Sequence, residues 1–134
     1  VGAYCDDDNG VNSGSAYVFE KPGSNWANMT QTAKLTASDG AASDYFGISV
    51  SISGDVIIVG AYLEDDNGNN SGSAYVFEKP SSNWADMTQT AKLLADDGVT
   101  NDWFGSSVGI SGDVIVVGAN GDDDNVAHEY CSAA

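Results

Sequence analysis

The chain repeats its own sequence with a period of 58 residues. The tripeptide Val1-Gly2-Ala3 returns at 59–61 and again at 117–119. A gap-free alignment of residues 2–59 with 60–117 gives 44 identical positions out of 58. Fixed periods of roughly this length are typical of propellers and other repeat arrays. In such arrays each unit buries its apolar face only against its neighbours, so the repeat predicts one array of a recurring supersecondary unit.

This array is predicted to fill residues 1–134 as a single domain. Repeat 1 covers 2–59, repeat 2 covers 60–117, and a partial, degenerate third copy covers 118–134. The chain starts inside a repeat and not with methionine and a basic stretch. That start suggests a processed mature chain or part of a longer gene product.

The charge of the chain limits the partners that it can have. It carries 20 acidic residues against four basic ones, for a formal net charge of −16. Such a field repels nucleic acid and anionic membranes and attracts cations. No stretch approaches the roughly 20 apolar residues of a membrane-spanning helix, so we expect no membrane insertion.

Each repeat reads as four strands separated by turns. In the one complete set of four they are expected at 45–52, 56–61, 73–78 and 88–94, with an acidic loop at 64–72. The first segment alternates apolar and small polar residues, which is typical of a half-buried strand, and the second is continuously apolar. No segment has a sustained helical period. The pattern predicts an all-β protein built from four-stranded antiparallel blades of the β-propeller type.

The glycine motifs of the repeat resemble a known family. Phe46-Gly47 and Phe104-Gly105 open one strand, and a Val-Gly-Ala tripeptide ends the next. This arrangement is similar to the FG-GAP repeat of integrin α-chain propellers, and most of all to its bacterial and algal extracellular branch. The resemblance runs from Val1 to about Asn125. It implies blades of a seven-bladed propeller that is commonly extracellular and often binds calcium.

The chain departs from that family in two ways. The integrin-like calcium loop between the first two strands of a blade is missing, because this hairpin is only Ser53-Gly54-Asp55. The chain also holds about two blades with partial blades at its ends, whereas propellers need roughly four to eight. We therefore expect either several chains that share a ring or stack, or a piece of a longer propeller.

Three acidic loops are candidate calcium sites. Calcium prefers six to eight hard oxygen ligands, and each loop offers carboxylates and an amide oxygen beside glycine or serine. Three like charges side by side are costly without a cation. The alternative is that these loops are solvated turns. The predicted ligands are Asp6, Asp7, Asp8 and Asn9; Glu64, Asp65, Asp66 and Asn67; and Asp122, Asp123, Asp124 and Asn125.

A second acidic group precedes the Phe-Gly motifs. We interpret these four side chains as caps of their own turns, a common role of aspartate, and not as metal ligands. They are Asp39, Asp44, Asp97 and Asp102.

One tryptophan recurs in each repeat, as Trp26 and Trp84. These side chains could stack on sugars or anchor a neighbouring subunit, but a plug over the outer edge of a blade is the favoured interpretation. Asn28 and Asn69 lie in glycosylation sequons, which matter only if the source is eukaryotic.

The two cysteines, Cys5 and Cys131, are confined to the terminal copies. They suggest a disulfide staple, which we favour between chains over within one chain; two free thiols are the alternative. The single histidine, His128, lies in the degenerate tail, and no pairing of a nucleophile with a base is visible. The sequence therefore predicts that the protein is not an enzyme.

Together these features favour a non-catalytic, secreted or otherwise extracellular module for structure or cell adhesion. Its blades would assemble with copies of itself or with a larger protein assembly. One alternative is a calcium-dependent, lectin-like module that binds carbohydrate. Another is an accessory subunit of a large complex outside the cytosol.

Overall fold

The structure, a computed structural model, describes residues 1–123. In this part of the chain every regular element is a strand, which confirms the all-β prediction. The strands are β1 Gly2–Ala3, β2 Ser15–Val18, β3 Ala33–Thr36, β4 Ser49–Ser53, β5 Val56–Ala61, β6 Ser73–Glu78, β7 Met87–Thr88, β8 Ala91–Leu93, β9 Phe104–Ser111 and β10 Val114–Ala119.

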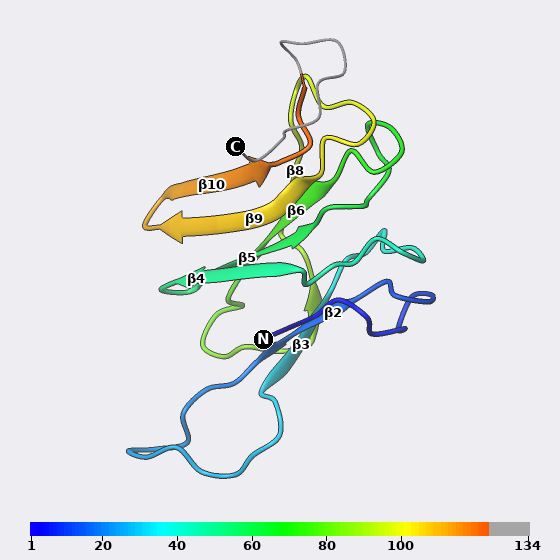
Figure 1. Cartoon of the computed structure of the whole chain (residues 1–134). Coiled ribbons are helices and arrows are strands. Elements are labelled where there is room, and N and C mark those ends of the chain that lie inside the picture. Colours follow the sequence, from blue (N-terminus) through cyan, green and yellow to red (C-terminus); the bar gives the residue numbers. More distant parts are fainter. Residues whose placement is uncertain (124–134) are drawn as a thin grey trace, which may run out of the picture.

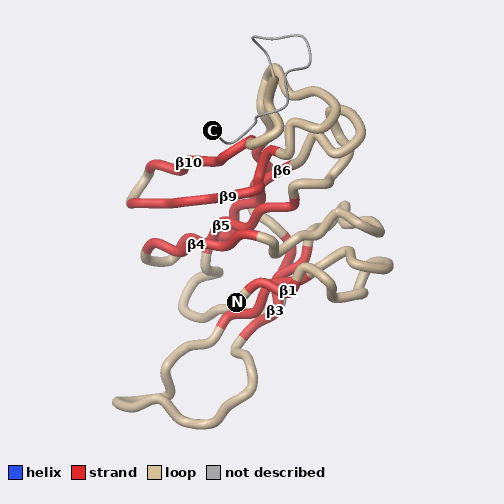
Figure 2. The backbone as a smooth tube through the Cα atoms, viewed as in Figure 1, coloured by secondary structure: helices blue, strands red, loops and turns tan. Residues whose placement is uncertain are grey.

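The strands form three sheets that lie side by side (Figure 1). The middle sheet, β4-β5-β6-β8, is a complete antiparallel blade. The first sheet has the order β1-β2-β3-β7, and the third is the hairpin β9-β10. We call them the first, second and third blades. Figure 2 shows that the loop between β2 and β3 extends away from all three.

The continuously apolar strand β5 lies in the middle blade and is covered on both faces. Ile57 and Val59 belong to the buried cluster shared with the first blade. Ile58 belongs to the cluster shared with the third blade. Successive side chains of a strand point to opposite faces of its sheet, so a strand between two neighbours is apolar at every position.

Glycine at the Val-Gly-Ala motif allows neighbouring blades to approach. A Cβ atom at Gly60 would lie 2.0 Å from the carbonyl oxygen of Gly105. Gly105 itself has φ +90°, a backbone conformation that side chains disfavour. The two glycine motifs therefore meet across the boundary between the second and third blades.

The first and last strands of the predicted blade needed correction. The first strand begins at Ser49 and not at residue 45, because Phe46 turns inward and joins the buried cluster between the first two blades. The predicted fourth strand, 88–94, is divided between two sheets. Its start, β7, pairs in parallel with β3 of the first blade, and only β8 belongs to the second.

This division makes residues 84–89 a connection between neighbouring blades, and we call them the bridging segment. Residues 26–31 occupy the same positions in the first repeat. They lie in the loop between β2 and β3 and form no strand.

Candidate functional site

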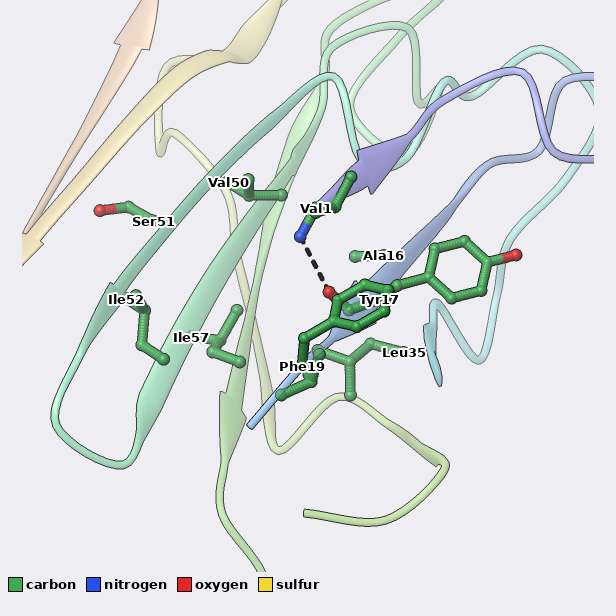
Figure 3. A pocket seen from close by; sticks show the side chains of 10 residues that line it. Val1, Ala16, Tyr17, Phe19, Leu35, Val50, Ser51, Ile52 and Ile57 are labelled. Carbon is green, nitrogen blue, oxygen red and sulfur yellow. Dashed lines mark hydrogen bonds between the residues drawn. The ribbon is translucent and has the colours of Figure 1, made fainter. Parts of the chain in front are cut away.

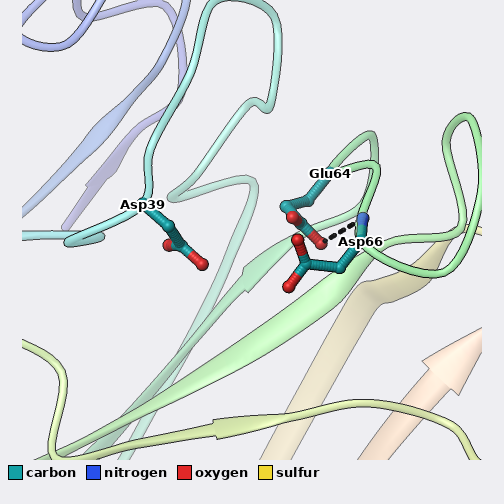
Figure 4. Close-up of side chains that lie close together, drawn as sticks. All are labelled: Asp39, Glu64 and Asp66. Atoms are coloured by element: carbon teal, nitrogen blue, oxygen red, sulfur yellow. Dashed lines mark hydrogen bonds between the residues drawn. The ribbon is translucent and has the colours of Figure 1, made fainter.

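Three carboxylates from two loops lie together beside the second blade (Figure 4). Asp39 comes from the loop after β3, and Glu64 and Asp66 come from the acidic loop after β5. Their nearest oxygen atoms all lie within 4.8 Å of one another. From the sequence, Glu64 and Asp66 were predicted as calcium ligands and Asp39 as a turn cap. The structure brings Asp39 into the same cluster instead.

The ammonium group of Lys92 contacts all three carboxylates. Its Nζ lies 2.7 Å from Asp39, 3.1 Å from Glu64 and 2.5 Å from Asp66. It also lies 5.2 Å from the centre of the Tyr75 ring, a cation–π distance. The ammonium group of Lys92 therefore already supplies a positive charge to this acidic cluster.

Burial and charge have opposite effects on these groups. Burial alone lowers the pKa of Lys92, but hydrogen bonds to Asp39 and Asp66 outweigh it and raise the pKa above its ordinary value. The bond from Lys92 lowers the pKa of Asp66 in return. Burial also raises the pKa of Tyr75. Lys92 and Asp66 are consequently both charged at neutral pH, as an ion pair requires.

The first repeat has a similar arrangement around Lys34. Its ammonium group pairs with Asp6 at 3.3 Å and with Asp8, and the hydroxyl of Tyr17 donates to Asp6 at 2.5 Å. Burial alone lowers the pKa of Lys34, but the hydrogen bonds to Asp8, Tyr17 and Asp6 raise it overall. The bond from Tyr17 lowers the pKa of Asp6, and that from Lys34 lowers the pKa of Asp8.

The middle acid of the first loop, and that of the second, closes its loop on itself. Asp7 accepts a hydrogen bond from the backbone N–H of Asn12 at 2.8 Å. Asp65 accepts one from the N–H of Asn70 at 2.7 Å. Aspartate often stabilises turns in this way. These two carboxylates therefore have a structural role whether or not a metal is present.

These contacts bear on the calcium prediction. The donor oxygens are of the type that calcium prefers. However, a metal was expected because the carboxylates lacked a compensating charge in the sequence, and in the structure Lys34 and Lys92 supply that charge. Calcium would have to compete with an ammonium group at the first and second loops. Asp122 and Asp123 of the third loop are described, whereas Asp124 and Asn125 lie outside the described residues.

The two equivalent tryptophans have opposite environments. Trp84 is only 6% exposed and belongs to the buried cluster that includes Leu35 of the first blade. Trp26 is 66% exposed. Trp84 therefore packs against the blade before its own, and the interpretation of the tryptophans as plugs over the outer edge of a blade stays a prediction.

Hydrogen bonds fix the bridging segment to the first blade on both sides of β7. The backbone N–H of Lys34 donates to Asp86 at 2.8 Å. The N–H of Ser38 donates to the side-chain oxygen of Gln89 at 2.9 Å, and Gln89 donates back to the Ser38 hydroxyl at 2.8 Å. The segment thus covers the backbone edge of β3, which would otherwise be open to pairing with another strand.

Turn capping holds for two of the four acids before the Phe-Gly motifs. Asp44 accepts from the N–H of Ala41 at 2.7 Å, and Asp102 accepts from the N–H of Val99 at 2.6 Å. Burial raises the pKa of Asp44 to about 6, and nearby carboxylates, Glu64 first among them, add to the effect.

Asp44 should make stability depend on pH in a window that its pKa defines. Because its pKa rises from 3.8 to about 6 on folding, the folded state binds more protons between these values. Its contribution to stability is present below pH 4 and is lost as pH rises to 6. An Asp44→Asn variant keeps an acceptor for Ala41 but does not titrate. We expect its unfolding free energy, relative to the native chain, to increase by on the order of 1–2 kcal/mol from pH 4 to 6.5. Urea titrations across this range measure the difference, and a constant difference would contradict the assignment.

The other predicted sites lie on the surface or outside the described residues. Cys5 is exposed, and Cys131 lies outside the described residues, so their disulfide stays a prediction. His128 also lies outside. Asn28 and Asn69 of the two sequons are exposed. No helix in the described part of the chain is long and apolar enough to cross a membrane.

Stacked antiparallel sheets that share apolar clusters, joined by segments that cross from blade to blade, define a β-propeller-like repeat protein. The chain belongs to the FG-GAP repeat family, whose model matches residues 1–19, 29–77 and 87–130. No curated protein matches the chain. Proteins of this family are generally structural or binding proteins and not enzymes.

Lys34 and Lys92 were not predicted from the sequence as parts of the acidic loops. Each lysine follows the first acid of its loop by 28 residues. Only the pairing of β3 with β2, and of β8 with β6, brings the lysines close to these acids. A usable signal was present, because both lysines recur with the period of the repeat. The signal is not specific, because all four lysines recur in this way, Lys21 as Lys79 and Lys34 as Lys92.

Proposed function

We propose that this protein is a non-catalytic extracellular module that serves structure or adhesion by packing its blades against other FG-GAP blades. FG-GAP repeat domains generally mediate protein interactions and are typical of extracellular proteins, which supports both parts of the proposal. The acidic surface is consistent with a protein partner and disfavours nucleic acid.

The observation that carries the proposal is a difference in burial between residues at equivalent positions of the two repeats. Leu35 of β3 is fully buried under the bridging segment, whereas its counterpart Leu93 of β8 is only partly buried. Trp84 and Trp26 differ in the same way. Side chains that form a core between the two repeats are therefore less buried at their other occurrence in the described structure. Surfaces of this kind are typical of interaction sites.

The mass of the protein in solution tests this function. We expect sedimentation to show species heavier than the 13.8 kDa chain, in a manner that depends on concentration. Salt should strengthen the association, because copies that each carry a charge of −16 repel one another and salt screens that repulsion. A single species of 13.8 kDa at every concentration and salt level would contradict self-assembly.

We also propose calcium as a ligand of the acidic loops, in competition with Lys34 and Lys92. A cation that binds only the folded state raises stability by mass action, by about 2.7 kcal/mol at a hundred times its dissociation constant. We expect millimolar calcium to raise the melting temperature at low salt relative to EDTA. Magnesium at the same concentration controls for screening. Identical melting curves in calcium and EDTA would contradict calcium binding at the loops.

The exposure of Trp26 favours a second candidate function, which is carbohydrate binding. An exposed indole can stack on the apolar face of a sugar. In that case glycans should change the fluorescence of the native chain, and the change should disappear in a Trp26→Ala variant. An accessory role in a larger complex outside the cytosol would instead appear as binding to a protein partner.

A further inference from the structure

We propose that Tyr45 and Tyr62 form an oxidative modification site, at which hydrogen peroxide and a haem peroxidase join the two rings as dityrosine. Such a crosslink is a property separate from the proposed assembly of blades. The two residues flank the hairpin β4-β5 of the second blade, which packs against both of its neighbours. Three observations support the site, namely the geometry of the rings, the backbone that holds them and the different surroundings of the other tyrosines.

The rings of Tyr45 and Tyr62 are stacked. Their centroids lie 6.0 Å apart, and their planes are inclined by only 16°. In a phenoxyl radical the unpaired electron occupies π lobes perpendicular to the ring, with much of its density on the carbons beside the one that carries the oxygen. Two nearly parallel rings direct these lobes toward one another. Groups held in such an orientation combine far faster than groups that must first meet by diffusion.

The backbone holds the Tyr45 ring in this place. Tyr45 has φ +54°, which is rare for a bulky residue, and strained backbone of this kind clusters at functional sites. Asp44 and Phe46 on either side of it are both buried. The N–H of Tyr45 donates to the carbonyl oxygen of Asn12 at 3.2 Å, and its own carbonyl oxygen accepts from the N–H of Ile48 at 3.2 Å. The Cα atom that carries the ring is therefore fixed on all sides.

Tyr62 is also held by its neighbours. It follows Ala61, the last residue of β5, which is buried and pairs with Ser73 of β6. Its ring contacts the indole of Trp103 edge to face, with centroids 6.5 Å apart and planes at 73°. Tyr45 and Tyr62 are both partly exposed. An oxidant can therefore remove an electron from either ring while the phenolic proton passes to water.

Tyr4 is the alternative coupling partner for Tyr45. The centroids of these two rings lie 5.8 Å apart, but their planes meet at 84°. In this edge-to-face arrangement the π lobes of one ring are nearly perpendicular to those of the other, which disfavours a bond between them. The two distances from Tyr45 are almost equal. The angle between the rings therefore selects Tyr62 as its partner.

Tyr17 and Tyr75 have different surroundings. Tyr17 lines a cavity between the first and second blades, with its hydroxyl pointing away from the other lining residues (Figure 3) and donating to Asp6. Tyr75 is fully buried, and its hydroxyl donates to Asp39 at 3.1 Å. Neither has a tyrosine ring beside it in the part of the chain that the structure describes. Coupling within one chain is therefore expected at the stacked pair.

The coupling reaction consumes one hydrogen peroxide for each crosslink. The peroxidase removes one electron and one proton from each phenol, and the peroxide becomes two molecules of water. The two radicals then form one carbon–carbon bond between ring positions beside the oxygen-bearing carbons. Each of these positions passes its hydrogen to the oxygen of its own ring, so the chain loses two hydrogen atoms in all. The product ties the turn before β4 to the end of β5.

Mass spectrometry of the oxidised protein tests the site. The native chain is treated with hydrogen peroxide and a haem peroxidase at a concentration at which it is a monomer, and its peptides are then mapped. We expect a crosslink within one chain between Tyr45 and Tyr62, with the loss of two hydrogen atoms. Tyr45→Phe and Tyr62→Phe keep the stacked ring but remove a phenol. Each should lower the dityrosine fluorescence per chain about tenfold or more, because only the pair is held in place to react.

Tyr4→Phe is the matched control and should retain the fluorescence of the native chain. Circular dichroism shows that the three variants fold, and a free tyrosine derivative in a parallel reaction shows that the oxidant is active. In urea the same treatment should spread crosslinks over the other tyrosines. With an active oxidant, the absence of the crosslink between Tyr45 and Tyr62 would overturn the site. A dominant crosslink from Tyr4 to Tyr45, products only between chains, or an unchanged yield in urea would overturn it equally.

Discussion

Replacing Trp84 with alanine is expected to lower the free energy of unfolding by about 3–5 kcal/mol, the usual cost of truncating a buried aromatic side chain. Trp84 lies in the core between the first two blades and holds the bridging segment against β3. Its loss should therefore separate the two repeats and expose the apolar cluster between them. Urea denaturation followed by circular dichroism measures the change.

The repeat supplies the matched control, which is Trp26→Ala. This side chain has the same local sequence but is 66% exposed, and exposed substitutions usually change stability by less than about 0.5 kcal/mol. The comparison is made at a protein concentration at which the chain is a monomer. Equal losses in the two variants would show that Trp26 is buried in solution, contrary to the structure.

Replacing Lys92 with methionine is expected to be the second most damaging change, at about 2–4 kcal/mol near pH 7. Methionine keeps an apolar stem over the Tyr75 ring but removes the charge. Asp39, Glu64 and Asp66 would then face one another within 4.8 Å without a cation. The estimate is below that for a fully buried ion pair because Asp39 and Asp66 are partly solvated.

The Lys92→Met variant should differ from the native chain in its response to pH and to calcium. In the native chain Lys92 lowers the pKa of Asp66 below 3.8, so this pair contributes stability above that value and loses it as pH falls further. In the variant the crowded carboxylates should bind protons more tightly when folded, so part of the loss should be regained as pH falls toward 4. Calcium should restore stability at pH 7 more strongly than in the native chain.

Lys34→Met is the control for this second variant. Lys34 neutralises two carboxylates, and all three side chains of that cluster are partly exposed. Its loss should therefore cost less. A Lys92→Met variant as stable as the native chain, or no more responsive to calcium, would show that the ammonium group does not hold the cluster together.

The period of the repeat and the alternation within it were enough to predict the all-β blades and the family. Strands such as β5 and β6 were correctly placed because a run of apolar residues between turn signals depends only on local sequence. The boundaries failed where a neighbouring blade decides them. Phe46 leaves its strand to enter a shared core, and residues 87–88 pair with the preceding blade.

The sequence by itself determined that the acidic loops, the tryptophans and the glycine motifs recur, and hence that each repeat has the same local chemistry. Only the tertiary structure decided what each copy of a residue does. Trp26 and Trp84 have the same neighbours in sequence, yet one is exposed and the other buried. Lys92 reaches acids 26 to 53 residues away in the chain. The physical reason is that burial and ion pairing depend on the adjacent blade, and a repeated sequence does not state which of its copies has one.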